Sequence, residues 1–331
     1  MGKPYALADG IPRDTFWKLP SPQKHDGLAR LTGVEIEFSG LTELEAAEVV
    51  ETLWGGKITE RAPHVIEVAE TEKGTVRIEL DTAWTNKAGS ALADKLLELS
   101  REVIPVEIVT APLLAEDLPE IDRLMGALES SGALGSQDGV LLAFGVHLNT
   151  EVASQTAAFI IPVVQAFAFI EQWLRSSDPP DVSRRVLPFI DPWPWSFVNR
   201  CAEDGAGWSL DDLCGTYLDL VRSRNHGLDL LPLLEQIFPD WVRAALPEGH
   251  AKGGRPTWHY RLPETGMGSE GWSIAYEWNR WVLVERVASD AALLSDLADA
   301  WTQHRSSLTT IRPDWAAQVE HLLRKPELWH G

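Results

Sequence analysis

Four short apolar runs of this chain each carry two polar side chains separated by one residue. The pairs are Glu35/Glu37, Glu79/Asp81, His147/Asn149 and His259/Arg261. A β-strand turns alternate side chains to opposite faces, so both members of a pair lie on one face. Carboxylates, imidazoles and guanidinium groups are ligands for divalent metals and phosphate. The pattern predicts a sheet with a metal- or phosphate-binding face, although a solvated sheet face explains any single pair taken alone.

Glu35 and Glu37 place a physical requirement on their surroundings. Two carboxylates about 7 Å apart repel by roughly 2 kcal/mol at an effective dielectric constant near 20. That energy exceeds the equivalent of one pKa unit. We therefore expect a cationic group to lie between the two side chains.

Strand and helix signals are mixed along the chain. Alternation predicts strands at 33–38, 65–68, 75–80, 106–110, 140–149 and 257–262. Helical spacing predicts helices at 41–53, 86–99, 118–130, 153–174, 272–288 and 291–303, with a further helical section over 209–238. Gly55-Gly56 is typical of a helix end, and the Pro-rich stretch 176–194 is typical of a loop. Antiparallel strand signals among helices favour an α+β fold over a doubly wound sheet.

Composition restricts the class of partner. The chain has 331 residues, 44% of them apolar, and a formal net charge of −20. Such an acidic protein is a poor binder of nucleic acid or anionic membranes, so neither is an expected partner. The two cysteines form no metal-binding pair, and the N-terminus has no apolar signal core, so we expect a cytoplasmic protein.

The apolar stretch 157–170 is shorter than a bilayer span and is expected to be a buried helix. The 15 tryptophans, which are concentrated in the second half, are expected mainly as core residues. No internal repeat or long linker is present, which favours one domain. We predict an N-terminal arm at 1–30, a catalytic domain at 31–305 and a C-terminal tail at 306–331.

The order of the polar motifs resembles the amidoligase family, distant relatives of glutamine synthetase and glutamate–cysteine ligase. The matching segments, in chain order, are Gly33–Phe38, Asp81, Glu107–Pro112, Gly145–Asn149, Arg184-Arg185, an expected Arg-rich helix at Arg222–Asn225, and Thr257–Arg261. The resemblance spans roughly Gly33 to Leu262 and implies a glutamine-synthetase-like curved antiparallel sheet that lines the active site and is backed by helices. No phosphate-binding loop motif is present, so any nucleotide would bind at a metal-lined sheet.

The resemblance also implies an activity, namely ATP-dependent ligation of a carboxylate to an amine through an acyl phosphate. The substrates would be small molecules or peptides. The implied metal ligands, for Mg²⁺ or Mn²⁺ against ATP, are Glu35, Glu37, Glu107, His147 and His259. The implied catalytic residues are Glu37, Arg261 and Asp81, the last of which orients or deprotonates the amine. Arg184, Arg185, Arg224 and Asn149 are implied to bind phosphate or the substrate carboxylate.

Two residues differ from the family pattern and keep other functions open. His259 stands where a metal-binding glutamate is usual, and Asn149 stands where a second histidine is common. One alternative is a metal-dependent hydrolase in which the same carboxylates and His147 activate water. The other is a catalytically inactive amidoligase-like scaffold that uses its Trp-rich half for protein contacts.

Overall fold

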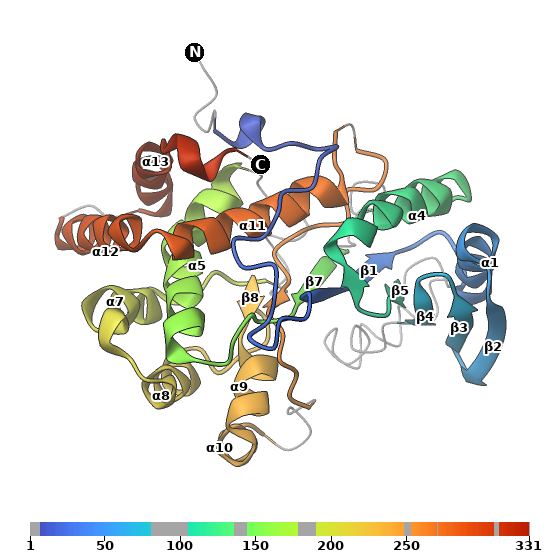
Figure 1. The fold of residues 1–331 in the computed structure, drawn as a ribbon, viewed down its shortest axis with the longest axis horizontal. Helices are drawn as coiled ribbons and strands as arrows, with labels where there is room; N and C mark the ends of the chain where they lie inside the picture. Colours follow the sequence, from blue (N-terminus) through green and yellow to red (C-terminus); the bar gives the residue numbers. More distant parts are fainter. Residues whose placement is uncertain are drawn as a thin grey trace, which may run out of the picture.

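A nine-stranded antiparallel sheet and ten α-helices make up the described part of the chain (Figure 1). The structure is a computed structural model. It describes residues 7–80, 105–135, 144–177, 190–247, 253–269, 271–307 and 311–330. The predicted combination of helices with an antiparallel sheet is confirmed. The specific likeness of that sheet to the one in glutamine synthetase stays a prediction.

The strands of the sheet come from widely separated parts of the sequence. They are β1 (Leu31–Phe38), β2 (Lys57–Ala62), β3 (Val65–Thr71), β4 (Gly74–Leu80), β5 (Val106–Val109), β6 (Leu113–Leu114), β7 (Val146–Thr150), β8 (Leu228–Asp229) and β9 (His259–Tyr260). Their order is β2-β3-β4-β5-β1-β7-β9-β8, and β6 also pairs with β1. The first predicted strand therefore lies in the interior of the sheet, between β5 and β7.

The helices lie mostly outside the sheet region and pack on one another (Figure 1). They are α1 (Glu43–Trp54), α4 (Pro119–Ser130), α5 (Ala157–Ser177), α7 (Trp195–Glu203), α8 (Leu210–Leu220), α9 (Leu231–Ile237), α10 (Pro239–Ala245), α11 (Ile274–Ser289), α12 (Ala291–Ser306) and α13 (Arg312–Leu322). The helices predicted near α1, α4, α5, α11 and α12 are confirmed. The helix predicted at 86–99 lies outside the described residues.

Alternation along β1 separates an apolar face from a polar one, as predicted. Val34, Ile36 and Phe38 are fully buried, whereas the glutamates between them are only partly buried. The chain then enters α1 through a capping box, in which Thr42 accepts a hydrogen bond from the Glu45 backbone N–H and the Glu45 side chain reciprocates.

One segment was not predicted and another differs from its prediction. Helix α1 ends at Trp54 before Gly55, as predicted, and residues 57–62, for which no element was predicted, form the edge strand β2, because left-handed Gly55 and Gly56 turn the chain back beside β3. Residues 209–238 are not one helical section. Helix α8 ends at Leu220, Arg222 has a left-handed φ of 45°, and β8 follows. The expected Arg-rich helix at 222–225 is therefore wrong, and these residues form an irregular connection to β8.

The apolar face of β9 joins the sheet to the helical layer. Trp258 and Tyr260 are fully buried, with ring centroids 5.8 and 5.3 Å from that of Trp281 in α11. Both rings thus lie in the core, as predicted, and leave His259 on the opposite face. Figure 1 shows α11 crossing α5, with which it is in contact.

Both ends of the described chain pack on this helical layer. The Trp17 backbone N–H donates to Asn279 Oδ1 of α11 at 2.7 Å, and the Trp315 indole of α13 donates to the Phe169 carbonyl of α5 at 2.8 Å. The division into arm, domain and tail stays a prediction.

Helix α5 is the one helix in the described part of the chain that is long and apolar enough to cross a membrane. Its most apolar 18-residue window has a mean hydropathy of 1.6, but 72% of that window is buried inside the protein. This burial agrees with the prediction of a core helix.

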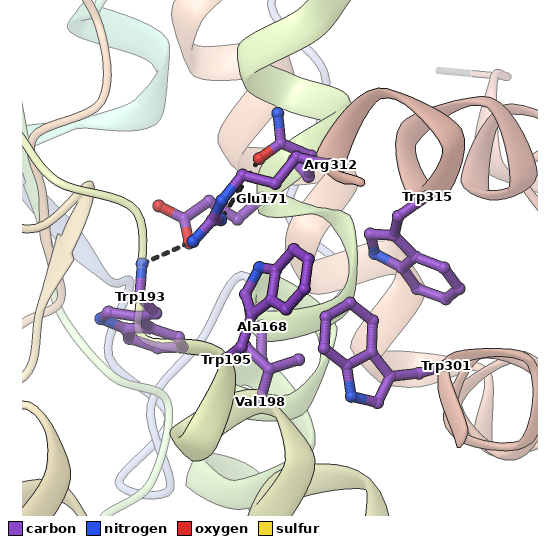
Figure 2. A pocket seen from close by; sticks show the side chains of 9 residues that line it. Ala168, Glu171, Trp193, Trp195, Val198, Trp301, Arg312 and Trp315 are labelled. Carbon is purple, nitrogen blue, oxygen red and sulfur yellow. Dashed lines mark hydrogen bonds between the residues drawn. The ribbon is translucent and has the colours of Figure 1, made fainter. Parts of the chain in front are cut away.

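Tryptophan rings fill space between the helices α5, α7, α12 and α13. Figure 2 shows Trp193, Trp195, Trp301 and Trp315 around a cavity of about 10 Å³, which has room for about one water molecule. The Arg305 guanidinium lies 4.1 Å from the Trp195 ring centroid. This cavity is too small for a substrate, and the rings around it serve packing.

A buried ion pair fastens the start of β1 to α11 and gives a stability prediction. Arg30 donates two hydrogen bonds of 2.7 Å to Glu285, and both side chains are at most 2% exposed. Arg30→Ala leaves the buried carboxylate of Glu285 without its ion-pair partner. The free energy of unfolding, measured by urea titration, should therefore fall by about 3–5 kcal/mol. The matched control is Arg123→Ala, which removes an exposed pair with Glu120 and should cost less than about 1 kcal/mol. Equal losses in the two variants would contradict a structural role for the Arg30 pair.

Candidate functional site

The register of the sheet brings the predicted polar pairs together. Across the ladders, Glu35 lies opposite His147 of β7, and Glu37 lies opposite Glu107 of β5. His147 Nδ1 lies 2.7 Å from Glu35 Oε2, and its Nε2 lies 3.8 Å from Glu37 Oε1. The imidazole of His147 therefore lies between the two carboxylates, the position at which a cationic group was expected.

The two glutamates are also held separately. The Glu35 carboxylate accepts a hydrogen bond from Asn149 Nδ2 at 3.0 Å and lies 3.9 Å from Arg255 Nη1. The Glu37 carboxylate accepts the Gly145 backbone N–H at 2.7 Å. Each side chain is thereby oriented along the same face of the sheet.

His259 reaches this face from β9 and is fixed from behind by Asp229 of β8. Its Nδ1 lies 3.0 Å from Asp229 Oδ2, and its Nε2 lies 3.9 Å from Glu35 Oε2. The rings of His147 and His259 meet edge to face with centroids 5.4 Å apart. His259 Nε2 is buried and has no hydrogen-bond partner.

Electrostatics fix the charge states of these groups. Burial would raise the pKa of Glu35, but the hydrogen bond from His147 and nearby positive charge outweigh it and hold that pKa well below its usual range. Burial lowers the pKa of His259 to about 4, against the opposing effect of its hydrogen bond to Asp229. Burial would raise the pKa of Asp229, but the His259 bond and the Arg224 charge lower it. Near neutral pH an anionic Glu35 therefore faces a neutral His259.

These charge states determine the hydrogen-bonding roles of the two side chains. A neutral His259 whose Nδ1–H donates to Asp229 keeps a lone pair on Nε2. This lone pair faces Glu35 Oε2, so two acceptors oppose each other. A cation between them would satisfy both.

Two overlapping clusters on this face have ligand atoms at metal-binding spacing. One consists of Glu35, His147 and His259, and the other of Glu37, Glu107 and His147. Within each cluster the ligand atoms lie within 4.8 Å of one another. Two atoms bonded to one ion at about 2.1 Å can be at most about 4.2 Å apart, and the 3.8 and 3.9 Å separations above meet that limit. These two pairs, one from each cluster, therefore fit a shared divalent metal.

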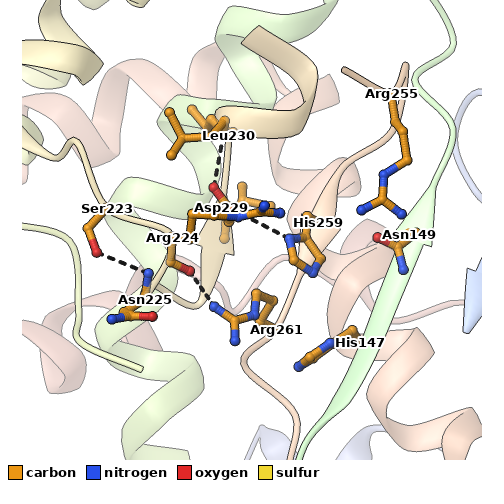
Figure 3. Close-up of polar contacts among 12 residues, drawn as sticks. His147, Asn149, Ser223, Arg224, Asn225, Asp229, Leu230, Arg255, His259 and Arg261 are labelled. Atoms are coloured by element: carbon orange, nitrogen blue, oxygen red, sulfur yellow. Dashed lines mark hydrogen bonds and ion pairs between the residues drawn. The ribbon is translucent and has the colours of Figure 1, made fainter. Parts of the chain in front are cut away.

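Three arginines surround the clusters (Figure 3). Arg224 Nε donates to Asp229 Oδ2 at 3.0 Å, and the Arg224 carbonyl accepts a hydrogen bond from Arg261. Arg261 Nε is buried without a partner. The Arg255 side chain is 47% exposed. Figure 3 shows Arg255 and Asn149 on one side of His259, with Arg224, Asp229 and Arg261 on the other.

The structure places most of the predicted site residues together. Glu35, Glu37, Glu107, His147, Asn149 and His259 share one face, and Arg224 and Arg261 border it. Asp81, Arg184 and Arg185 lie outside the described residues.

Two residues of the site, Asp229 and Arg255, were not predicted from the sequence. A lone aspartate in the apolar run Leu228–Leu231 is a signal for a buried charge with a partner. The segment Gly253-Gly254-Arg255-Pro256 indicates a turn, but it carries no signal that Arg255 belongs to the site.

A larger cavity of about 730 Å³ lies apart from these clusters. It is lined by the N-terminal segment, α4 and the loop that precedes α11, and by none of the cluster residues. Thr265, the neighbour of the wall residue Gly266, donates from Oγ1 to the carbonyl of Gly145, whose N–H donates to Glu37. The candidate site is therefore defined by the side-chain clusters and not by cavity size.

Comparison with known proteins agrees with the resemblance inferred from the motifs. A family model described as "Putative amidoligase enzyme" matches residues 28–283. A search of curated proteins and a search of solved structures gave no match. The matched range includes every strand of the sheet from β1 to β9 and all residues of both clusters. Since this match covers well over half of the chain, the chain belongs to the family of putative amidoligase enzymes.

Proposed function

We propose that this chain is an ATP- and Mg²⁺-dependent ligase that joins a carboxylate to an amine. The observation that carries the proposal is the convergence of two carboxylate–imidazole clusters on one face of an antiparallel sheet. Membership of the amidoligase family supports a ligase-type reaction. The substrates, the cytoplasmic location and the nucleotide are parts of the proposal.

Both clusters supply the residues that hold metal in this proposal. They are Glu35, Glu37, Glu107, His147 and His259. Bound Mg²⁺ or Mn²⁺ would neutralise charge on the phosphate oxygens of ATP. The protein keeps these side chains in place before any ligand arrives, through the bonds of Glu37 to Gly145 and of His259 to Asp229.

The proposed reaction has two steps. An oxygen of the substrate carboxylate attacks the γ-phosphorus of ATP, the bond to the β-phosphate oxygen breaks, and ADP leaves. The amine nitrogen then attacks the acyl carbon, the bond to the phosphate oxygen breaks, and the amine loses a proton. The products are an amide, ADP and phosphate, and in both steps the protein mainly positions the reactants and stabilises charge.

The basic and polar residues at the border take the remaining roles. Arg261 has a buried Nε without a hydrogen-bond partner beside the clusters. It would stabilise the phosphoryl group during transfer, and Glu37 would lie at the reacting phosphate. Asn149, whose Oδ1 is also buried without a partner, would bind the nucleotide. Arg184 and Arg185 keep their proposed role as anion ligands, and Asp81 that of orienting the amine.

Arg224 and Arg255 differ in how well they suit the anion-binding role predicted for Arg224. Arg224 already forms an ion pair with Asp229. Its main role is therefore to hold Asp229 in place, and Asp229 in turn orients His259. Arg255 is half exposed at the edge of the Glu35 cluster and is the better placed to receive a phosphate or a substrate carboxylate from solvent.

A second function, metal-dependent hydrolysis, is favoured by one observation. The Glu35 cluster contains two imidazoles and one carboxylate, a donor set also found around hydrolytic zinc. The two functions separate in one assay. A ligase should release ADP only when a carboxylate and an amine are both present, whereas a hydrolase should turn over substrate without ATP.

Binding of MgATP tests the nucleotide site directly. Calorimetric titration should detect MgATP binding to the wild-type chain, and Glu107→Gln should weaken it by about tenfold or more, because one anionic ligand is lost. The matched control is Glu67→Gln in β3, a carboxylate on the same sheet that pairs with Arg61 outside both clusters. The absence of MgATP binding at millimolar concentration would contradict the proposal of an ATP-dependent ligase.

Replacement of Glu37 separates chemistry from folding. Glu37→Gln keeps the shape and the hydrogen-bond acceptor for Gly145 but removes the charge. ADP release from a panel of amines and carboxylates should fall by roughly 100-fold or more. The melting temperature should change little in the absence of metal. If the variant unfolds, or keeps full activity, Glu37 has a structural role and the site is wrong.

A further inference from the structure

The two clusters differ in the chemistry of their ligand atoms. The cluster of Glu37, Glu107 and His147 offers two carboxylates and one imidazole, whereas the cluster of Glu35, His147 and His259 offers one carboxylate and two imidazoles. Mg²⁺ prefers oxygen ligands, while imidazole nitrogen suits zinc, iron and other first-row transition ions. The clusters therefore should not select the same metal.

His259 is oriented in the way that a metal-bound histidine usually is. Its Nδ1 lies 3.0 Å from Asp229 Oδ2, a contact that fixes the ring and, with the proton on Nδ1, leaves a lone pair on Nε2. The side chain is more than nine-tenths buried, and Nε2 has no hydrogen-bond partner although it lies 3.9 Å from Glu35 Oε2. A buried acceptor without a donor is costly unless a cation binds there.

His147 has a carboxylate behind it in the same sense. Its Nδ1 faces Glu35, and its Nε2 faces Glu37 at 3.8 Å. When Nδ1 carries the lone pair, the Nε2–H points to Glu37. Each of the two imidazoles therefore has Glu35 on one side and a second carboxylate, Glu37 or Asp229, on the other.

We propose that Glu35, His147 and His259 form a transition-metal site that takes Zn²⁺ in preference to Mg²⁺, with Asp229 as the positioning residue for His259. The proposal rests on the proposed function for the role of the bound ion, but the metal preference is measured without turnover. The oxygen-rich cluster around Glu37 and Glu107 remains the place for Mg²⁺. His147 belongs to both clusters, and an imidazole that keeps one N–H offers a single lone pair, so it ligates in one cluster at a time.

Calorimetric titration of the metal-free full chain with ZnCl₂ and with MgCl₂ tests the proposal. Zn²⁺ should bind roughly 100-fold more tightly than Mg²⁺ to the wild-type chain. His259→Gln should abolish this preference, and His259→Glu should reduce it by about tenfold or more while keeping Mg²⁺ binding. The matched control is His25→Gln, an exposed histidine that belongs to neither cluster, which should leave both affinities unchanged. Equal Zn²⁺ affinities in His259→Gln and His25→Gln would overturn the proposal.

The visible spectrum of the Co²⁺-loaded chain tests the role of Asp229. Asp229→Asn keeps a hydrogen-bond acceptor but removes the charge that fixes the imidazole, so Zn²⁺ affinity should fall by about 10–100-fold and the Co²⁺ absorption bands should shift. Circular dichroism checks that each variant is folded. Unchanged affinity and unchanged bands in folded Asp229→Asn would show that Asp229 is not a positioning residue.

The two proposals fail in different ways. Tight Zn²⁺ binding that depends on His259, together with no ATP-dependent ligation, would overturn the proposed function and keep the transition-metal site. Ligation with Mg²⁺, together with no Zn²⁺ preference, would keep the proposed function and overturn the transition-metal site.

Discussion

The contact between the carboxylate of Glu35 and the imidazole of His147, 2.7 Å across the β1–β7 ladder, is the interaction on which the candidate site depends. Glu35 and Glu37 point the same way from one strand, and their repulsion has to be offset. His147 offsets it by placing one ring nitrogen toward each carboxylate. That arrangement requires β7 to pair with β1 in this register, since a shift by one residue would turn His147 to the apolar face.

The rest of the fold keeps that register in place. Val34 and Ile36 of β1 and Leu148 of β7 are fully buried on the opposite face, so slippage would expose apolar side chains and bury charged ones. The apolar residues of β9 are held against Trp281, which leaves His259 pointing to Glu35. The buried Arg30–Glu285 pair ties the start of β1 to the same helix, α11. Packing on one side of the sheet thus positions the chemistry on the other side.

Local alternation was sufficient to predict which residues share the polar face. Period-two spacing identified the pairs in β1 and β7 and His259 in β9, and the expected repulsion between Glu35 and Glu37 predicted a group between them, a position that the imidazole of His147 takes. The two-residue strand β8 was not predictable in the same way. It is too short for a periodic signal, and it forms only because β9 is there to pair with it. Asp229 was missed for that reason. Arg255 was missed because its position depends on the path of an irregular loop, which local sequence does not fix.

The central claim is that the polar face of the sheet is a metal centre. Anomalous diffraction from crystals of the full chain soaked in MnCl₂ tests it most directly, because Mn²⁺ is accepted by both oxygen and nitrogen ligands and is visible at its absorption edge. A metal centre on this face should give an anomalous peak within bonding distance of His147 and of Glu35 or Glu37. Peaks confined to exposed carboxylates, with the Glu35–His147 hydrogen bond unchanged, would contradict it.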